Sequence, residues 1–145
     1  MIGLLQRVSS ASVTVDDQRI AKIGQGLMVL VGIEKNDSRE QAERLVKKLL
    51  SYRVFADDDG KMNLSVLDIA GEVLLVPQFT LAADTNKGLR PSFSSAASPQ
   101  QGADLFSAVV DIMSQQMPQV QTGQFGADMA VELINDGPVT FWLQV

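Results

Sequence analysis

The chain has 145 residues, of which 46% are apolar and 20% are charged, and its mean hydropathy is +0.10. This length and composition are typical of one compact domain and exclude a disordered or fibrous chain. The chain has no histidine and no cysteine, which excludes a Ser-His-Asp triad, a cysteine nucleophile, a Cys/His zinc site and a disulfide. Any catalysis therefore depends on other side chains, backbone groups or the substrate itself, and we expect no metal and no cofactor.

The net charge of −5 is unevenly distributed. Residues 1–90 hold all 12 lysines and arginines together with 12 acidic residues, whereas residues 91–145 hold five acids and no base. Such a chain is not a generic basic nucleic-acid binder, and we expect no DNA partner. No apolar run approaches the roughly 20 residues needed to cross a bilayer, and no segment resembles a signal peptide. We therefore expect no membrane association and a cytoplasmic location.

The first third of the chain predicts a hairpin followed by a central strand. Residues 12–15 and 20–23 carry alternating or apolar strand patterns around a turn-like segment at 16–19. After two glycines, residues 27–31 form a continuous apolar run. Such a run is typical of a strand that is buried on both faces.

A helix is predicted from Ser38, because Gln41 completes a capping-box pattern and apolar residues follow at helical spacing. Its basic residues lie mostly off the apolar stripe, which is consistent either with a solvated helix face or with a surface that faces RNA. These basic residues are Arg39, Arg44, Lys47, Lys48 and Arg53. The acidic segment 57–60 lacks the later ligands of a calcium loop and predicts a surface turn.

Residues 73–76 predict a second buried strand, which ends at Pro77 because proline cannot donate to a strand ladder. The following stretch, 82–97, has no periodicity and is long for a chain of this size, which favours a functional loop over a disordered one. The residues that favour this interpretation are Lys87, Gly88, Arg90, Pro91 and Phe93.

A second helix is predicted from Ser98, with a proline at its first position and Gln101 as a capping-box partner. Alternating residues at 129–134 and 139–145 then predict two strands that are interrupted by 135–138. Because the chain ends without a polar tail, we expect its end to be held in a sheet or an interface.

Two segments do not fit simple core building: 77–80, at the end of a buried strand, and 135–140. From the residues alone, the first could be a strand end whose Gln and Thr satisfy nearby backbone groups. The second could be an ordinary turn. Neither segment is specific by itself.

Together with other spaced segments, however, these two resemble the bacterial D-aminoacyl-tRNA deacylase family over essentially the whole chain. The segments that carry the resemblance are Gln6-Arg7-Val8, Gly60-Lys61-Met62-Asn63, Gln78-Phe79-Thr80-Leu81, Arg90-Pro91-Ser92-Phe93 and Asn135-Asp136-Gly137-Pro138-Val139-Thr140. One departure is Pro77, where the family usually has serine. The resemblance implies one domain over residues 1–145, with an α+β, β-barrel-like fold, two main helices and a homodimer with its active sites at the interface.

The implied activity is hydrolysis of the ester that joins a D-amino acid, or glycine mischarged on tRNA-Ala, to the 3′ end of tRNA. By position, the resemblance assigns catalysis to Gln78, Phe79 and Thr80. It also assigns selection of chirality to Gly137 and Pro138, as a cis peptide that enters the partner subunit's site. Further candidate substrate-binding residues are Phe125, Met129 and Asn135, with plain core packing as the alternative for Phe125 and Met129.

Selection of D over L substrates by a backbone wall has a physical basis that does not depend on the resemblance. If the scissile carbonyl and the ammonium of the aminoacyl group are both held, a rigid backbone wall on one side of Cα tolerates only hydrogen there. D substrates fit and L substrates clash, whatever their side chain. Gly137 would allow the close approach, and a cis Pro138 would hold the carbonyls. Glycine has hydrogen on both sides, so we expect its ester to be hydrolysed too.

Thr80 is a candidate nucleophile, but the chain has no histidine to activate it. The amine nearest in sequence is Lys87, and its spacing does not establish contact with Thr80. We therefore expect Thr80 to position the substrate, whose own 2′-hydroxyl lies beside the ester. The acidic chain predicts few phosphate contacts, with recognition concentrated on the terminal adenosine. The alternatives are a non-catalytic dimeric module that binds RNA ends or a metabolite, and a divergent hydrolase of another acyl ester.

Overall fold

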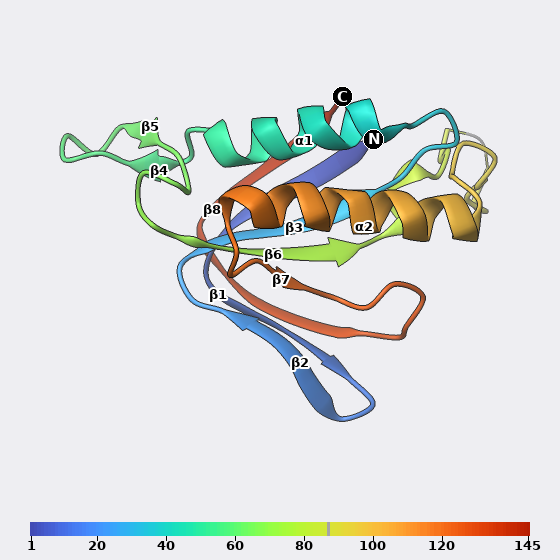
Figure 1. The fold of residues 1–145 in the computed structure, drawn as a ribbon, viewed down its shortest axis with the longest axis horizontal. Coiled ribbons are helices and arrows are strands. Elements are labelled where there is room, and N and C mark those ends of the chain that lie inside the picture. Colours follow the sequence, from blue (N-terminus) through green and yellow to red (C-terminus); the bar gives the residue numbers. More distant parts are fainter. Residues whose placement is uncertain (87) are drawn as a thin grey trace.

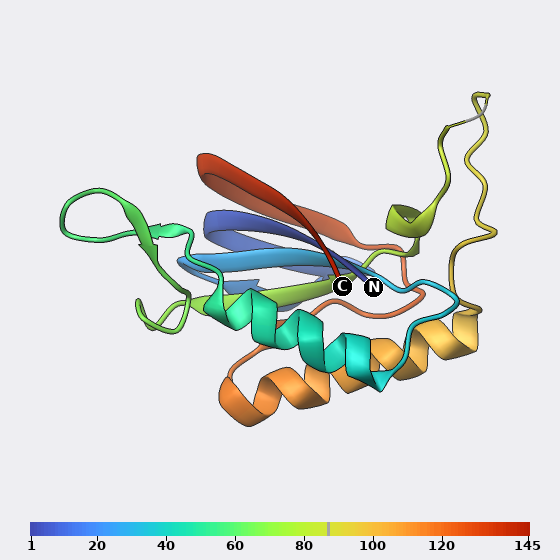
Figure 2. The same ribbon diagram turned by 90° about the horizontal axis from the view of Figure 1, so that it is seen from above.

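The computed structural model describes residues 1–86 and 88–145. Two helices lie side by side on one face of a strongly bent sheet, as both views show (Figures 1 and 2). The helical elements are α1 (Arg39–Ser51), the 3-10 helix η1 (Phe79–Ala82) and α2 (Pro99–Gln116). The strands are β1 (Ile2–Val15), β2 (Gln18–Ile23), β3 (Gly26–Gly32), β4 (Phe55–Ala56), β5 (Met62–Leu64), β6 (Glu72–Pro77), β7 (Gln121–Thr122) and β8 (Ala130–Gln144).

The main sheet has the strand order β2-β1-β3-β6-β7, and β8 pairs with the other edge of β1. The first half of β1 pairs with β3, its second half pairs with β2, and β8 follows most of its length. The sheet curls until β2 approaches β6 and β7, which nearly closes a barrel. The prediction of a single α+β domain with a barrel-like sheet and two main helices is confirmed.

The strand predicted at 27–31 is the central strand β3, and its two faces are buried in different parts of the core. Leu27 and Val29 are fully buried in the cluster formed with α1 and α2. Met28 points into the second cluster, between the curled halves of the sheet. A strand with apolar layers on both sides reads as a continuous apolar run, which is why the sequence located it correctly.

Both helices begin where the sequence predicts, but they are capped differently. At α1, Ser38 and Gln41 form the complete capping box. At α2, the Ser98 hydroxyl accepts a hydrogen bond from the Gln101 N–H at 3.3 Å, but the predicted return bond is not made. The Gln101 amide instead donates to the Lys35 carbonyl at 3.0 Å. Because that carbonyl lies within reach, Gln101 links the start of α2 to the turn before α1.

The predicted interruption of the last strand is wrong. Residues 130–144 form one continuous strand, β8, and residues 135–138 are accommodated as a bulge. Thr140 pairs with Gln6, and Asn135 pairs with Val8. Between these two pairs the chain advances by five residues along β8 but by only two residues along β1. The surplus residues project from the ladder, because the partner strand holds both flanks of the bulge in antiparallel register.

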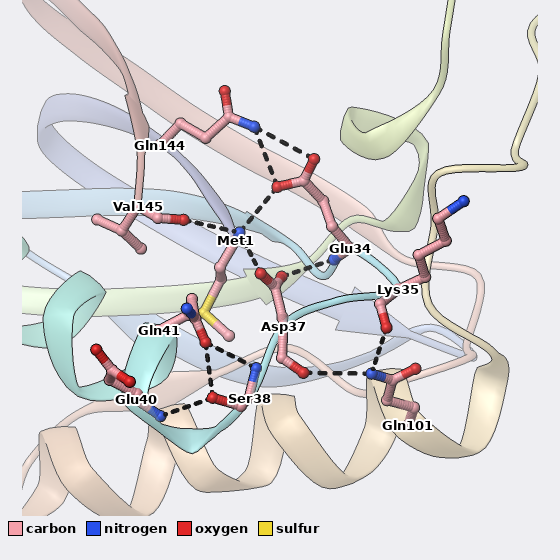
Figure 3. A network of polar contacts seen from close by, with 10 residues as sticks. All are labelled: Met1, Glu34, Lys35, Asp37, Ser38, Glu40, Gln41, Gln101, Gln144 and Val145. Atoms are coloured by element: carbon pink, nitrogen blue, oxygen red, sulfur yellow. Dashed lines mark hydrogen bonds and ion pairs between the residues drawn. The ribbon is translucent and has the colours of Figure 1, made fainter.

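A polar network holds both chain ends beside the turn before α1 (Figure 3). The buried Met1 ammonium donates to the Glu34 carboxylate at 2.8 Å and to the Asp37 carboxylate at 2.6 Å. The Val145 N–H donates to the Met1 carbonyl at 3.1 Å, which extends the pairing of β8 with β1. The expectation that the last strand is held in a sheet is therefore confirmed.

The carboxylate of Glu34 should make stability depend on pH. Partial burial raises the pKa of Glu34, but hydrogen bonds from the Met1 ammonium and Gln144, together with the ammonium charge, outweigh burial and leave that pKa below its ordinary value. Its ionised form therefore stabilises the fold fully above the ordinary pKa, and this contribution is lost as pH falls through the lowered pKa.

We expect Glu34→Gln to reduce the free energy of unfolding near neutral pH and to cost progressively less as the pH falls below about 4. Urea denaturation of both proteins over this pH range measures the difference. Glu132→Gln, at an exposed position of β8, is the matched control. A cost for Glu34→Gln that does not change with pH would contradict the ionic role.

Candidate functional site

The parallel pairing of β3 with β6 positions the first candidate segment. Val31 pairs with Pro77 in the last step of this ladder, and the Gln78 N–H donates to the Val31 carbonyl at 2.8 Å. Directly after this bond, the chain turns into η1, which begins at Phe79. Gln78 and Phe79 therefore lie at the carboxyl end of two parallel strands, where open sheets commonly bind ligands.

A mainly apolar pocket of about 270 Å³ opens at this edge. Its walls come from the ends of β3 and β6, the start of α2 and the loop before β8, which are far apart in the sequence. The residues that line it are Val31, Ile33, Pro77, Gln78, Phe79, Ala97, Ser98, Pro99, Gly102, Phe125 and Gly126. Among the three substrate-binding candidates, Phe125 lies in this wall.

Two glycines shape the pocket by allowing close approach. A Cβ at Gly102 would lie 3.0 Å from the ring of Phe125, so the absence of a side chain lets this ring lie against α2. A Cβ at Gly32 would lie 2.8 Å from the Cβ of Leu81 and would push η1 away from β3. Neither glycine is predictable from the sequence, because its role depends on contacts between distant segments.

Thr80 is exposed, and its hydroxyl accepts a hydrogen bond from the side-chain amide of Gln78. Among the described residues, no carboxylate or amine bonds to this hydroxyl, and no acceptor bonds to the backbone N–H of Phe79 or of Thr80. The segment thus presents two unengaged backbone donors beside a hydroxyl held by an amide. Such donors can stabilise negative charge that develops on a substrate oxygen.

An exposed aromatic pair lies beside these donors. The Phe79 side chain is 59% exposed and that of Phe93 is 42% exposed, and their ring centroids lie 5.2 Å apart. Phe93 belongs to the segment predicted as a functional loop, which is closed by reciprocal backbone hydrogen bonds between Asp84 and Ser92. Lys87 lies outside the described residues. Exposed aromatic faces can stack on nucleic-acid bases.

The second candidate segment is the bulge of β8. Gly137 and Pro138 are exposed and joined by a cis peptide bond, and Gly137 has a φ of 123°. Arg7 holds the bulge: its Nε donates to the Asp136 carbonyl at 3.0 Å, and its Nη1 donates to the Val54 carbonyl at 2.6 Å. Arg7 is part of the resemblance, but its contact with this segment was not predicted from the sequence.

Within one chain, the bulge and the pocket are well separated. The bulge is paired opposite residues 6–8 of β1. The end of β6, in contrast, is in register with Gly3 of β1, because Val31 of β3 pairs with both Gly3 and Pro77. Strand geometry makes this offset about 13 Å along the strands and about 14 Å across them. Gly137 and Pro138 therefore do not line the pocket formed by their own chain.

The other two candidates do not line the pocket. Met129 packs against the second core cluster, and its sulfur accepts a hydrogen bond from the Gln124 N–H at 3.3 Å. Asn135 lies on β8, where its amide is 3.4 Å from the side-chain oxygen of Gln6. The structure thus brings Gln78, Phe79 and Phe125 together around the pocket, with Thr80 bonded to Gln78, and leaves these two residues outside.

The described part of the chain contains no group of three or more acidic, histidine or cysteine side chains that could hold a metal ion. Over the same residues, no helix is both long and apolar enough to cross a membrane.

A family model described as D-Tyr-tRNA(Tyr) deacylase matches residues 4–144. The chain belongs to this family. It is 59% identical to a D-aminoacyl-tRNA deacylase of Shewanella frigidimarina and 57% identical to one of Salmonella typhimurium, in each case over 145 residues and the full length of both chains. As a member of this family, the chain is a hydrolase that acts on carboxylic esters.

Solved structures share the fold, among them the following two. One, titled c-Myc DNA Unwinding Element Binding Protein, is 39% identical with a TM-score of 0.96, and the alignment covers 100% of this chain and 99% of that one. The other, a probable eukaryotic D-amino acid tRNA deacylase, is 17% identical with a TM-score of 0.87, and the coverage is 99% and 98%. At that identity, the second likeness concerns the fold alone.

Proposed function

We propose that this chain hydrolyses the ester bond between a D-amino acid, or glycine mischarged on tRNA-Ala, and the 3′ end of tRNA in the cytoplasm. The observation that carries the proposal is the arrangement at the end of β6, where a small apolar pocket adjoins the unengaged N–H groups of Phe79 and Thr80. The pocket receives the terminal adenosine, and the donors face the ester.

The form of the pocket favours one nucleoside over a longer segment of RNA. Its volume of about 270 Å³ is small, and its wall is mainly apolar. Phe79 and Phe93 offer exposed rings at the same place, and single-stranded RNA is commonly bound by stacking of its bases on aromatic side chains. Phe125 closes the wall on the side of α2.

In the proposed reaction, a water oxygen attacks the ester carbonyl, and the ribose 3′-oxygen leaves with a proton. The backbone donors stabilise the negative charge on the carbonyl oxygen, and such donors are each worth about 3 kcal/mol in other hydrolases. The chain has no histidine, so the 2′-hydroxyl of the substrate orients the attacking water and assists the proton transfer. Thr80, held by Gln78, positions these groups and forms no covalent intermediate.

Selection of D substrates is assigned to Gly137 and Pro138 of a second copy of the chain. Their separation from the pocket within one chain supports this assignment, because only another subunit could bring them to the ester. β8 is also an edge strand with Ile134 61% exposed and Trp142 52% exposed. Long apolar edge strands of this kind are usually covered by a partner.

The proposal predicts which enantiomers are hydrolysed. We expect the protein to release D-tyrosine from D-Tyr-tRNA and glycine from Gly-tRNA-Ala, and to hydrolyse L-Tyr-tRNA at least about 100-fold more slowly, since the wall tolerates only hydrogen on one side of Cα. Release of radiolabelled amino acid measures all three rates. A non-catalytic binding module would release none of them, and equal rates for both enantiomers would exclude the wall.

The positioning role of Thr80 predicts a partial loss of activity. Thr80→Val keeps the shape of the side chain and removes the hydroxyl bonded to Gln78, and we expect kcat to fall about 10- to 100-fold without being abolished. Thr80→Ser, which restores a hydroxyl, should recover most of this loss. Complete loss in Thr80→Val, together with an acyl ester trapped on Thr80 of the unmodified protein, would establish a nucleophile instead.

The composite site predicts complementation between variants. Gln78→Ala damages the pocket half of the site, and Gly137→Ala, whose new Cβ would meet the Arg7 guanidinium at 2.8 Å, damages the bulge half. Mixing the two variants under subunit exchange should restore about a quarter of the D-selective hydrolysis, because half of the dimers are mixed and one of their two sites is intact. No recovery from two folded variants, as judged by circular dichroism, would contradict a shared site.

A further inference from the structure

The outer face of α1 carries a basic stripe, defined here as Arg44, Lys47 and Lys48. These residues follow the i, i+3, i+4 spacing that places side chains on one helix face, and they lie opposite the buried face. The acids of α1 precede them: Glu40 lies in the first turn, and Glu43 pairs with Arg39 at 3.5 Å. Within residues 1–86 and 88–145, no member of the stripe forms an ion pair.

Helix stability explains only part of this pattern. A cation in the last turn interacts favourably with the helix dipole, which accounts for Lys48. Like charges at this spacing repel one another, however, and although Glu40 and Glu43 stand four residues before Arg44 and Lys47, neither acid forms an ion pair with them in the described part of the chain. The neighbouring α2 carries Asp104 and Asp111 and no basic residue. An anionic partner on this face is therefore attracted to α1 and repelled by α2.

The basic stripe is connected to the pocket by the turn before α1. Ile33 lines the pocket, and Lys35 follows two residues later, with its backbone held by Ser95 and Gln101. The Lys35 side chain points away from the polar network (Figure 3), and Lys35 is exposed. From Arg39, α1 then runs for about 20 Å along the face that it shares with α2 (Figure 1).

We propose that the basic stripe of α1, together with Lys35, binds backbone phosphates in the acceptor stem of the tRNA whose 3′ end occupies the pocket. This inference rests on the proposed function. The acceptor stem begins only a few nucleotides from the esterified ribose, so its phosphates lie within reach of a helix that starts beside the pocket. A small number of contacts also suits a chain with a net charge of −5.

A second basic surface on the molecule is less suited to phosphate. Arg19 and Lys22 of β2 line a hollow of about 210 Å³, but the carboxylate of Glu132 lines the same hollow and opposes an anion. This hairpin also projects from the sheet away from both helices (Figure 1). Arg19 and Lys22 therefore provide a control with the same change in charge.

The test compares the double variants Lys47→Gln/Lys48→Gln and Arg19→Gln/Lys22→Gln. For each, kcat and KM are measured with D-Tyr-tRNA and with the D-tyrosyl ester of adenosine, at about 50 and about 200 mM salt. Loss of two phosphate contacts should raise KM for D-Tyr-tRNA, and the ratio of variant to unmodified KM should shrink about tenfold over this salt range. The kinetics of the adenosine ester, and all parameters of the Arg19/Lys22 variant, should stay unchanged.

Binding of uncharged tRNA, measured by filter retention, separates this inference from the proposed function. If the unmodified protein hydrolyses no D-Tyr-tRNA but binds tRNA through Lys47 and Lys48, the proposed function is wrong, whereas the binding of tRNA phosphates by α1 is supported. Equal losses in both double variants, or no loss in either, would overturn the assignment to α1. So would a change in sedimentation of the Lys47/Lys48 variant without a change in KM, because the stripe would then face a second copy of the chain.

Discussion

The parallel ladder between β3 and β6 is the constraint on which the candidate site depends. Its last bond, from the Gln78 N–H to the Val31 carbonyl, fixes where η1 begins and which backbone donors stay unengaged. The ladder tolerates little variation, because a Cβ at Gly26 would lie 1.9 Å from the Glu72 carbonyl oxygen at its first step. Backbone contacts thus fix both ends of this strand pair, and they thereby also fix the position of the residues that line the pocket at its carboxyl end.

The bulge of β8, opposite residues 6–8 of β1, follows the same principle. Arg7 anchors it from within the sheet by binding the carbonyls of Asp136 and Val54, and its side chain is only 14% exposed. A buried guanidinium with several acceptors is a rigid support, because each bond restricts the others. β1 therefore carries Arg7, which anchors the bulge, whereas the pocket is formed at the ends of β3 and β6. The two halves of the proposed site are distant in one chain, and the proposal joins them through a second copy of the chain.

Much of the fold was predictable because its signals are local. The run at 27–31, the cap at Ser38 and the strand ending at Pro77 each follow from residues within one element. The bulge was wrongly predicted as an interruption of the strand. Its turn-forming residues do not reveal that β1 pairs with the residues of β8 both before and after them. Arg7, Gly32 and Gly102 were missed as parts of the site for the same reason. Their roles exist only through contacts with segments far along the chain.

The chemistry of the pocket explains why backbone geometry carries so much of the proposed function. No described residue that lines the pocket has a titratable side chain. The chain can then offer a substrate fixed dipoles, apolar walls and a positioned hydroxyl, but no proton acceptor comparable to histidine. Fixed dipoles stabilise a transition state only when they are already oriented, since reorientation during the reaction would consume the gain. A site of this kind depends on glycines that allow close packing and on strand ladders that hold amides in place. The same rigidity would let a backbone wall distinguish hydrogen from any larger substituent.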